Sequence, residues 1–145
     1  MRYLFDTNHC IYLMNGWGAP DNRLTPQERN TVEAFAALHN GAVYMSEASF
    51  GELYYGVERS QKKEHNLRRL QVLVSGLPPV SINRNVWEVY GEVKAELSRQ
   101  GKTIPDMDLL IASTAKCYDM VLVANDKHMA LLPDSFNQEN WAKAT

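Results

Sequence analysis

Residues 121–126 read Val-Leu-Val-Ala-Asn-Asp, a short apolar run that ends in two polar residues. A run without polar interruption is typical of a strand buried on both faces, as in a parallel sheet covered by helices. The same arrangement occurs near the N-terminus, where Tyr3–Phe5 is followed by Asp6 and then by a helix-like segment. Ligands of open α/β sheets collect beyond the carboxyl ends of the strands, so we expect Asp6 and Asp126 to face one crevice.

Strand-like and helix-like segments alternate over the rest of the chain. Further short strands are expected at 42–45 and 78–82, with a last edge strand near Phe136. Apolar residues recur at helical spacing between the strands, and Thr25 is a predicted N-cap. Helices are therefore predicted at 7–15, 25–39, 46–57, 63–74, 83–99 and 105–118, with a short helix after Asp126. Strands separated by helices imply βαβ units and a mainly parallel sheet.

The composition is that of an ordinary globular protein, with 45% hydrophobic and 22% charged residues. The length of 145 residues fits a single domain over residues 1–145. The net charge of −2 argues against a general nucleic-acid binder. If four acids bind metal, however, 13 of the 17 Asp and Glu remain against 15 Lys and Arg, and the rest of the molecule is mildly basic.

The sequence carries no sign of secretion or of a membrane segment. Met1 and Arg2 lead directly into the first predicted strand, which leaves no room for a signal peptide. No apolar run reaches the length of a membrane span. Cys10 and Cys117 match no metal spacing or disulfide framework and are expected to be reduced. These features predict a cytoplasmic protein.

Four carboxylates from separated segments are candidates for one divalent-metal site: Asp6, Glu52, Asp108 and Asp126. The three aspartates are expected near helix starts, where the helix dipole favours the ionised form. Glu52 is expected in mid-helix, one turn before Gly56. Each aspartate taken alone could equally be a helix cap. Together the acids would repel one another without a cation, and their hard oxygen ligands favour Mg²⁺ or Mn²⁺.

The order of these segments resembles the four motifs of PIN-domain ribonucleases, and most closely those of VapC-type toxins of toxin-antitoxin pairs. The matching segments are Asp6-Thr7-Asn8, Ser-Glu-Ala-Ser-Phe-Gly-Glu-Leu-Tyr-Tyr-Gly at 46–56, Asp-Leu-Leu-Ile-Ala at 108–112, and 121–126. The resemblance covers almost the whole chain and extends to Trp141. It implies a three-layer α/β sandwich whose central, mainly parallel sheet has four to five strands flanked by helices.

The resemblance also implies a Mg²⁺- or Mn²⁺-dependent endoribonuclease. The family's catalytic, metal-binding acids match Asp6, Glu52, Asp108 and Asp126. Supporting positions are expected at Thr7, Asn8, Asp106 and Asn125, with Asn8 supporting Asp6. Asp106 is a candidate for helix capping or for direct ligation, and capping is favoured because it would project to a different side from Asp108. Further implied are a structured RNA substrate cut in a tRNA or ribosomal RNA loop, a cognate antitoxin protein and a homodimer.

Three features depart from the family's pattern. Ala124 stands where Thr or Ser is common, His128-Met129 stands where an acidic-aromatic pair is common, and the segment 16–40 is longer than usual. These departures motivate an alternative, a catalytically weakened PIN-like module that binds RNA or protein. A phospho-acceptor receiver module is disfavoured, because Asp6 has no adjacent acid and Lys127 is poorly placed.

The remaining polar and aromatic residues leave several alternatives open. A basic cluster is either a solvated helix face or a contact for the RNA backbone, and it comprises Arg59, Lys62, Lys63, Arg68 and Arg69. Tyr54 and Tyr55 could stack on bases, but packing in the core or a dimer contact is favoured. His128 lies close enough to Asp126 in sequence to touch substrate, whereas surface or packing roles are expected for His9, His39 and His65.

Overall fold

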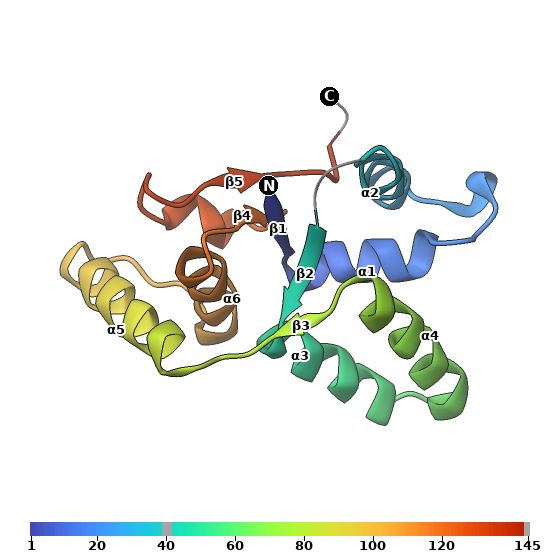
Figure 1. Cartoon of the computed structure of the whole chain (residues 1–145), viewed down its shortest axis with the longest axis horizontal. Coiled ribbons are helices and arrows are strands. Elements are labelled where there is room, and N and C mark those ends of the chain that lie inside the picture. The colour runs from blue at the N-terminus through green and yellow to red at the C-terminus, as the bar shows by residue number, and fades with distance from the viewer. Residues whose placement is uncertain (39–41, 144–145) are drawn as a thin grey trace.

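Five short strands form one parallel sheet in the computed structural model, which describes residues 1–38 and 42–143. The strand order is β3-β2-β1-β4-β5 (Figure 1). The strands are β1 (Arg2–Phe5), β2 (Ala42–Ser46), β3 (Pro79–Val80), β4 (Val121–Val123) and β5 (Gln138–Glu139). In the central pairs, Tyr3 lies opposite Val43 on β2 and Val121 on β4. The predicted α/β class, with a mainly parallel sheet of four to five strands, is confirmed.

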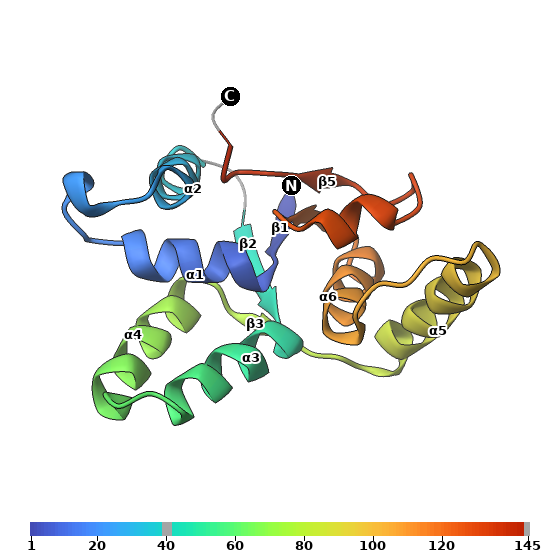
Figure 2. The same ribbon diagram turned by 180° about the vertical axis from the view of Figure 1, so that it is seen from behind.

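Helices cover both faces of the sheet. They are α1 (Thr7–Gly16), η1 (Asp21–Arg23), α2 (Pro26–Ala36), α3 (Glu47–Glu58), α4 (Lys63–Gly76), α5 (Arg84–Arg99), α6 (Asp106–Cys117) and η2 (Lys127–Leu131), of which η1 and η2 are 3₁₀ helices. Figures 1 and 2 show α5 and α6 together on one side of the sheet and α1, α2 and α4 on the other. The three-layer arrangement that the family resemblance implied is therefore present.

Successive side chains of the central strands enter two separate cores. Leu4 of β1 and Leu122 of β4 pack with residues of α5 and α6. Phe5 and Val123 pack instead with residues of α1, α3 and α4. All four side chains are fully buried. Because β4 is covered on both faces, every residue of this strand must be apolar.

The strand order changes direction at the centre of the sheet. From β1 the chain proceeds outward to β2 and β3, and it then returns to place β4 on the other side of β1. The carboxyl ends of β1 and β4 therefore flank a topological switch point, the place where open α/β sheets bind ligands. Asp6 follows β1 directly, and Asp126 caps the helix η2 that follows β4.

The strand predicted at 78–82 is shorter than expected, because it begins with two prolines. Proline has no N–H for a strand ladder, and β3 is confined to Pro79–Val80. Ile82 donates its backbone N–H to Glu47 Oε2 (3.1 Å) rather than to a strand. The last edge strand lies just beyond the predicted position, because the Phe136 side chain is buried in the core and its N–H closes a turn.

Helix α2 ends earlier than predicted, at Ala36 rather than His39. After it, Leu38 donates its N–H to Phe35 O (3.3 Å), the tighter spacing of a 3₁₀ turn, which ends the α-helical ladder. The predicted end at His39 lies outside the described residues. The start is as predicted, since Thr25 and Glu28 form a capping box.

Two further expectations concern the cysteines and membrane segments. Cys10 is buried and Cys117 is half-buried, and both are free thiols. Over residues 1–38 and 42–143, we find no helix with the length and apolar character that crossing a membrane requires.

Candidate metal centre

Asp6 is held at the junction of β1 and α1, where it is the N-cap of α1. Its Oδ1 accepts hydrogen bonds from the backbone N–H of His9 (2.8 Å) and from His9 Nδ1 (2.9 Å). Its Oδ2 accepts the backbone N–H of Asn125 (3.1 Å). The residue is 4% exposed. A buried carboxylate with three hydrogen-bond donors is satisfied and has one fixed orientation.

Asp108, Asp126 and His128 form a compact group beside the switch point. Each residue offers one atom that could bind a metal, and these three atoms all lie within 4.8 Å of one another. His128 Nδ1 is 2.9 Å from Asp126 Oδ1 and 3.5 Å from Asp108 Oδ2. These are ion-pair distances without hydrogen-bond geometry, since this buried nitrogen has no hydrogen-bond partner among the described residues. The backbone of η2 fixes the group, because His128 N–H donates to Asp126 Oδ1 (2.8 Å).

Glu52 approaches the site from α3 and is tied to the first residue of α1. The Thr7 hydroxyl donates to Glu52 Oε1 (2.5 Å) and lies 3.2 Å from the Ser49 hydroxyl. Thr7 adjoins Asp6 in the chain, so this contact draws the middle of α3 toward the end of β1. Thr7 was expected to be a supporting donor, and the carboxylate that it contacts is Glu52.

The acids affect one another electrostatically. Burial raises the pKa of Asp108, and so do the negative charges of Asp126, Glu52 and, more weakly, Asp6, while His128 acts in the opposite direction. Burial and the same negative field, from Asp6 and Glu52, also raise the pKa of the neighbouring Cys10 thiol. Like charges gathered at a partly buried site are unfavourable unless a cation neutralises them.

A divalent cation fits this donor set. Carboxylate oxygens suit Mg²⁺ and Mn²⁺, and the imidazole of His128 suits a first-row transition metal better than Mg²⁺. The hydrogen bonds that orient Asp6 and Glu52 are of the kind that fix ligands in protein metal sites. A cation would also offset the repulsion from neighbouring acids, which adds to the effect of burial in raising the pKa of Asp108.

Asp106 points away from this group, and the prediction that it caps α6 is wrong. Pro105 occupies the N-cap position, and α6 has no side-chain cap. Asp106 Oδ1 instead accepts from Tyr90 Oη (2.8 Å) and Lys94 Nζ (2.8 Å), both on α5. The hydrogen bond from Lys94 is the main reason that the pKa of Asp106 is lowered. Direct ligation finds no support, because this exposed carboxylate is engaged by a neighbouring helix.

Asn8 was expected to support Asp6 but does not contact it. The residue that holds Asp6 is His9. Asn8 Nδ2 reaches only the backbone oxygen of Asn125, at 3.5 Å. His9 is fully buried and binds Asp6 with both its backbone N–H and its ring. The packing role expected for His9 is therefore present, and its hydrogen bonds to Asp6 add a second role that was not predicted. The signal was the Asp-x-x-His spacing at a helix start, which places the fourth residue beside the cap.

Four residues of the basic cluster divide into two parts, and the fifth, Arg59, lies over the ring of Tyr55 with its guanidinium carbon 5.4 Å from the ring centroid. Arg69 is a structural contact between helices, because it donates to Met14 O (3.2 Å) and to Asn15 Oδ1 (2.8 Å) at the end of α1. Lys62, Lys63 and Arg68 line a surface hollow at the turn between α3 and α4. The contact for an RNA backbone remains a prediction for this second part.

Comparisons with known proteins agree with this fold. Residues 3–134 match the family model described as PIN domain. Because this match covers most of the chain, the protein belongs to the PIN-domain family.

Within that family its relatives are VapC proteins. The chain is 35% identical to the ribonuclease VapC2 of Rickettsia felis, covering 99% of this chain and 100% of that protein. It is 26% identical to the tRNA(fMet)-specific endonuclease VapC of Shigella flexneri, covering 98% and 99% of the two chains. The crystal structure of VapBC2 from Rickettsia felis, bound to a promoter DNA fragment, has a TM-score of 0.80 at 34% identity and covers 97% of this chain and 99% of that chain. The resemblance to VapC-type toxins is confirmed.

Proposed function

We propose that this chain is a Mg²⁺- or Mn²⁺-dependent endoribonuclease that acts as a toxin. The supporting observation is the gathering of four carboxylates at the switch point, where burial and then the charges of Asp126, Glu52 and Asp6 raise the pKa of Asp108. Such crowding lowers stability and is characteristic of a functional site. Two relatives carry the names ribonuclease and tRNA(fMet)-specific endonuclease, which supports RNA as the class of substrate.

The proposed metal ligands are Asp6, Glu52, Asp108 and Asp126, with His128 as an additional nitrogen ligand. When bound, a divalent cation polarises a phosphate and lowers the pKa of a water molecule. Neither Asp6 nor Glu52 is part of the group whose ligand atoms lie within 4.8 Å of one another. Besides binding the metal, the Glu52 carboxylate, which the Thr7 hydroxyl holds, is proposed to orient the attacking water and to accept its proton. Asn125 supports the site by donating its backbone N–H to Asp6.

The proposed substrate is a structured RNA that is cut in a tRNA or ribosomal RNA loop. A relative from Shigella flexneri carries the name tRNA(fMet)-specific endonuclease, which supports tRNA. Lys62, Lys63 and Arg68, at the turn between α3 and α4, are the proposed contacts for phosphates outside the scissile bond. Since the substrate is RNA, we place the protein in the cytoplasm.

A cognate antitoxin and a second copy of the chain are the proposed partners. The similar structures from Rickettsia felis and Haemophilus influenzae are of VapBC, which supports an antitoxin partner. We propose that this antitoxin covers the acidic site. Tyr54 and Tyr55 on α3 are 41% and 64% exposed, so the expectation that they pack in the core is wrong. Their exposure is consistent with the alternative, a contact in the homodimer.

Two aspartates of α6 provide a matched test. Purified wild-type protein should cleave tRNA in Mn²⁺ or Mg²⁺ and not in EDTA. Asp108→Asn should abolish cleavage, whereas Asp106→Asn, two residues away and paired with Lys94, should cleave like the wild type. Sequencing of the cleaved RNA ends would identify the loop. Intact RNA with all three proteins and both metals would refute the proposal.

One observation favours the alternative of a module that binds RNA without cutting it. Ala124 provides no hydroxyl beside Asp126 where relatives of this family commonly have one. The same experiment separates the two functions. A binding module would retain tRNA equally well in the wild type and in Asp108→Asn, and neither protein would shorten it.

A further inference from the structure

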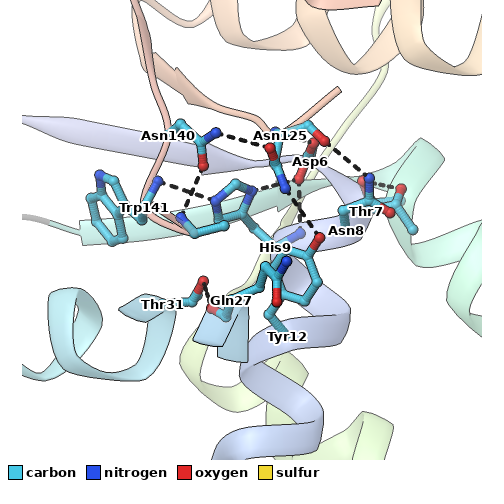
Figure 3. A network of polar contacts seen from close by, with 12 residues as sticks. Asp6, Thr7, Asn8, His9, Tyr12, Gln27, Thr31, Asn125, Asn140 and Trp141 are labelled. Carbon is cyan, nitrogen blue, oxygen red and sulfur yellow. Dashed lines mark hydrogen bonds and ion pairs between the residues drawn. The ribbon is translucent and has the colours of Figure 1, made fainter. Parts of the chain in front are cut away.

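A turn at residues 140–142, here called the C-terminal turn, is bonded to the residues that hold Asp6 (Figure 3). The backbone N–H of Trp141 donates to His9 Nε2 (3.2 Å). Asn140 Nδ2 donates to Asn125 Oδ1 (2.9 Å), and Asn140 Oδ1 accepts the backbone N–H of Ala142 (2.9 Å). The turn therefore reaches the carboxylate of Asp6 by two routes, one through His9 and one through Asn125.

The contact with Trp141 determines where His9 carries its proton. Since the backbone N–H of Trp141 donates to His9 Nε2, this nitrogen has a lone pair and no proton. The proton is consequently on Nδ1, which donates to Asp6 Oδ1 over 2.9 Å. An imidazole in this form is a donor without charge. His9 therefore fixes the orientation of Asp6 and leaves its negative charge available to a cation.

The two carboxylate oxygens of Asp6 accept different numbers of hydrogen bonds. Oδ1 accepts two hydrogen bonds, both from His9, which matches the usual capacity of a carboxylate oxygen. Oδ2 accepts one, from the backbone N–H of Asn125, and retains a free lone pair. Asn125 is itself fixed on both sides of its amide, by Asn140 and by Tyr12 Oη (3.2 Å).

We propose that His9 is a positioning residue for metal binding, which the C-terminal turn holds in the tautomer that donates to Asp6. This inference rests on the proposed function, because it concerns the cation that Asp6 binds. His9 and the turn keep Oδ1 occupied and present Oδ2 to the cation. The outer partners of metal ligands commonly act in this way, and their loss reduces metal affinity by about 10- to 100-fold.

Two substitutions of His9 separate its two hydrogen bonds. His9→Asn places an amide nitrogen near the position of Nδ1, so the donor to Asp6 is kept and the acceptor for the N–H of Trp141 is lost. His9→Gln places its amide near the position of Nε2, so the acceptor is kept and the donor is lost. Both variants leave the backbone N–H of residue 9 in place.

The two variants should respond in opposite ways in two measurements. Mn²⁺ affinity, measured by calorimetry, should be close to the wild-type value in His9→Asn and weaker by about tenfold or more in His9→Gln. Thermal stability in EDTA should fall further in His9→Asn, which leaves the partly buried N–H of Trp141 without its acceptor. Leu70→Val, a change in the buried core of α4, provides a control that loses stability without touching Asp6 and should bind Mn²⁺ like the wild type.

The outcomes separate the inference from the proposed function. If His9→Gln binds Mn²⁺ as tightly as the wild type, or if affinity follows thermal stability across all variants, His9 has only a structural role and the inference is overturned. If the wild type itself binds no Mn²⁺, and Asp108→Asn behaves identically, the proposed function is overturned together with the inference. Weak binding by His9→Gln with retained binding by His9→Asn supports both.

Discussion

Replacing Asp108 by asparagine should make the metal-free protein more stable, although it removes a proposed catalytic acid. The substitution keeps the size of the side chain and deletes one negative charge from the crevice. In the folded protein this charge is opposed first by burial and then by Asp126, Glu52 and Asp6. These costs are absent in the unfolded chain, where the carboxylate is solvated. The substitution therefore stabilises the folded state relative to the unfolded chain.

Coulomb's law gives the size of this gain. The ligand atoms of Asp108 and Asp126 lie within 4.8 Å of each other. Two unit charges at that separation repel by about 0.9 kcal/mol in a water-like medium and by about 3.5 kcal/mol at an effective dielectric constant of about 20. The Asp108 side chain is 24% exposed, so solvent screens only part of the repulsion, and His128 offsets some of it. We expect an increase in the free energy of unfolding of about 1 to 3 kcal/mol.

The difference between the two proteins should depend on pH in a defined direction. The pKa of Asp108 is raised on folding, so the folded state holds this proton more tightly than the unfolded chain. At low pH the carboxyl is protonated in both states, and the substitution has no electrostatic effect. As the pH rises through the folded-state pKa, ionisation lowers the stability of the wild type alone. The advantage of Asp108→Asn therefore grows with pH and is complete above that pKa.

Urea unfolding followed by circular dichroism, in EDTA at several pH values, measures this difference directly. Addition of Mn²⁺ provides a second check, because a ligand that binds the folded state stabilises it by about 2.7 kcal/mol at one hundred times its dissociation constant. This gain should appear in the wild type and be much smaller in Asp108→Asn. Equal or lower stability of the variant in EDTA at neutral pH would refute the reasoning, as would a difference that does not change with pH.

Three further predictions concern residues around the crevice. Thr7→Val removes the hydroxyl that holds Glu52 and should lower the cleavage rate by about tenfold with little change in thermal stability, as single-turnover cleavage and a melting curve would show. His128→Ala should weaken Mn²⁺ binding by about tenfold and Mg²⁺ binding much less, which parallel titrations would test, and equal losses for both metals would exclude a nitrogen ligand. Asp106→Asn should lower stability slightly in dilute buffer, and melting curves in high salt should show no loss, since its partner Lys94 is exposed.

The arrangement of strands could be predicted because it depends on local pattern. The apolar runs at Tyr3–Phe5 and 121–123 indicate buried parallel strands without knowledge of their partners, and both form the centre of the sheet. The short β3 shows the limit of this reasoning. Its apolar character resembles that of a strand, but adjacent prolines reduce the number of backbone N–H groups that can pair.

The contacts around the acids could not be predicted in the same way. The acceptor role of His9 depends on an N–H of Trp141, a residue 132 positions away. The pairing of Asp106 depends on the side chains that α5 presents to the start of α6, here Tyr90 and Lys94. Sequence pattern indicates which face of a helix a residue occupies, but the neighbouring helix determines which partner it finds.

The order of the strands also limits when the crevice can form during synthesis. Asp6 leaves the ribosome early, whereas β4 and the C-terminal turn, which complete its surroundings, are among the last described segments to be made. A growing chain that contains only the first half of the sheet has Asp6 and Glu52 but lacks Asp108 and Asp126. The four proposed ligands of the metal are therefore all present only after residue 126 has been made, and the C-terminal turn that binds His9 follows them.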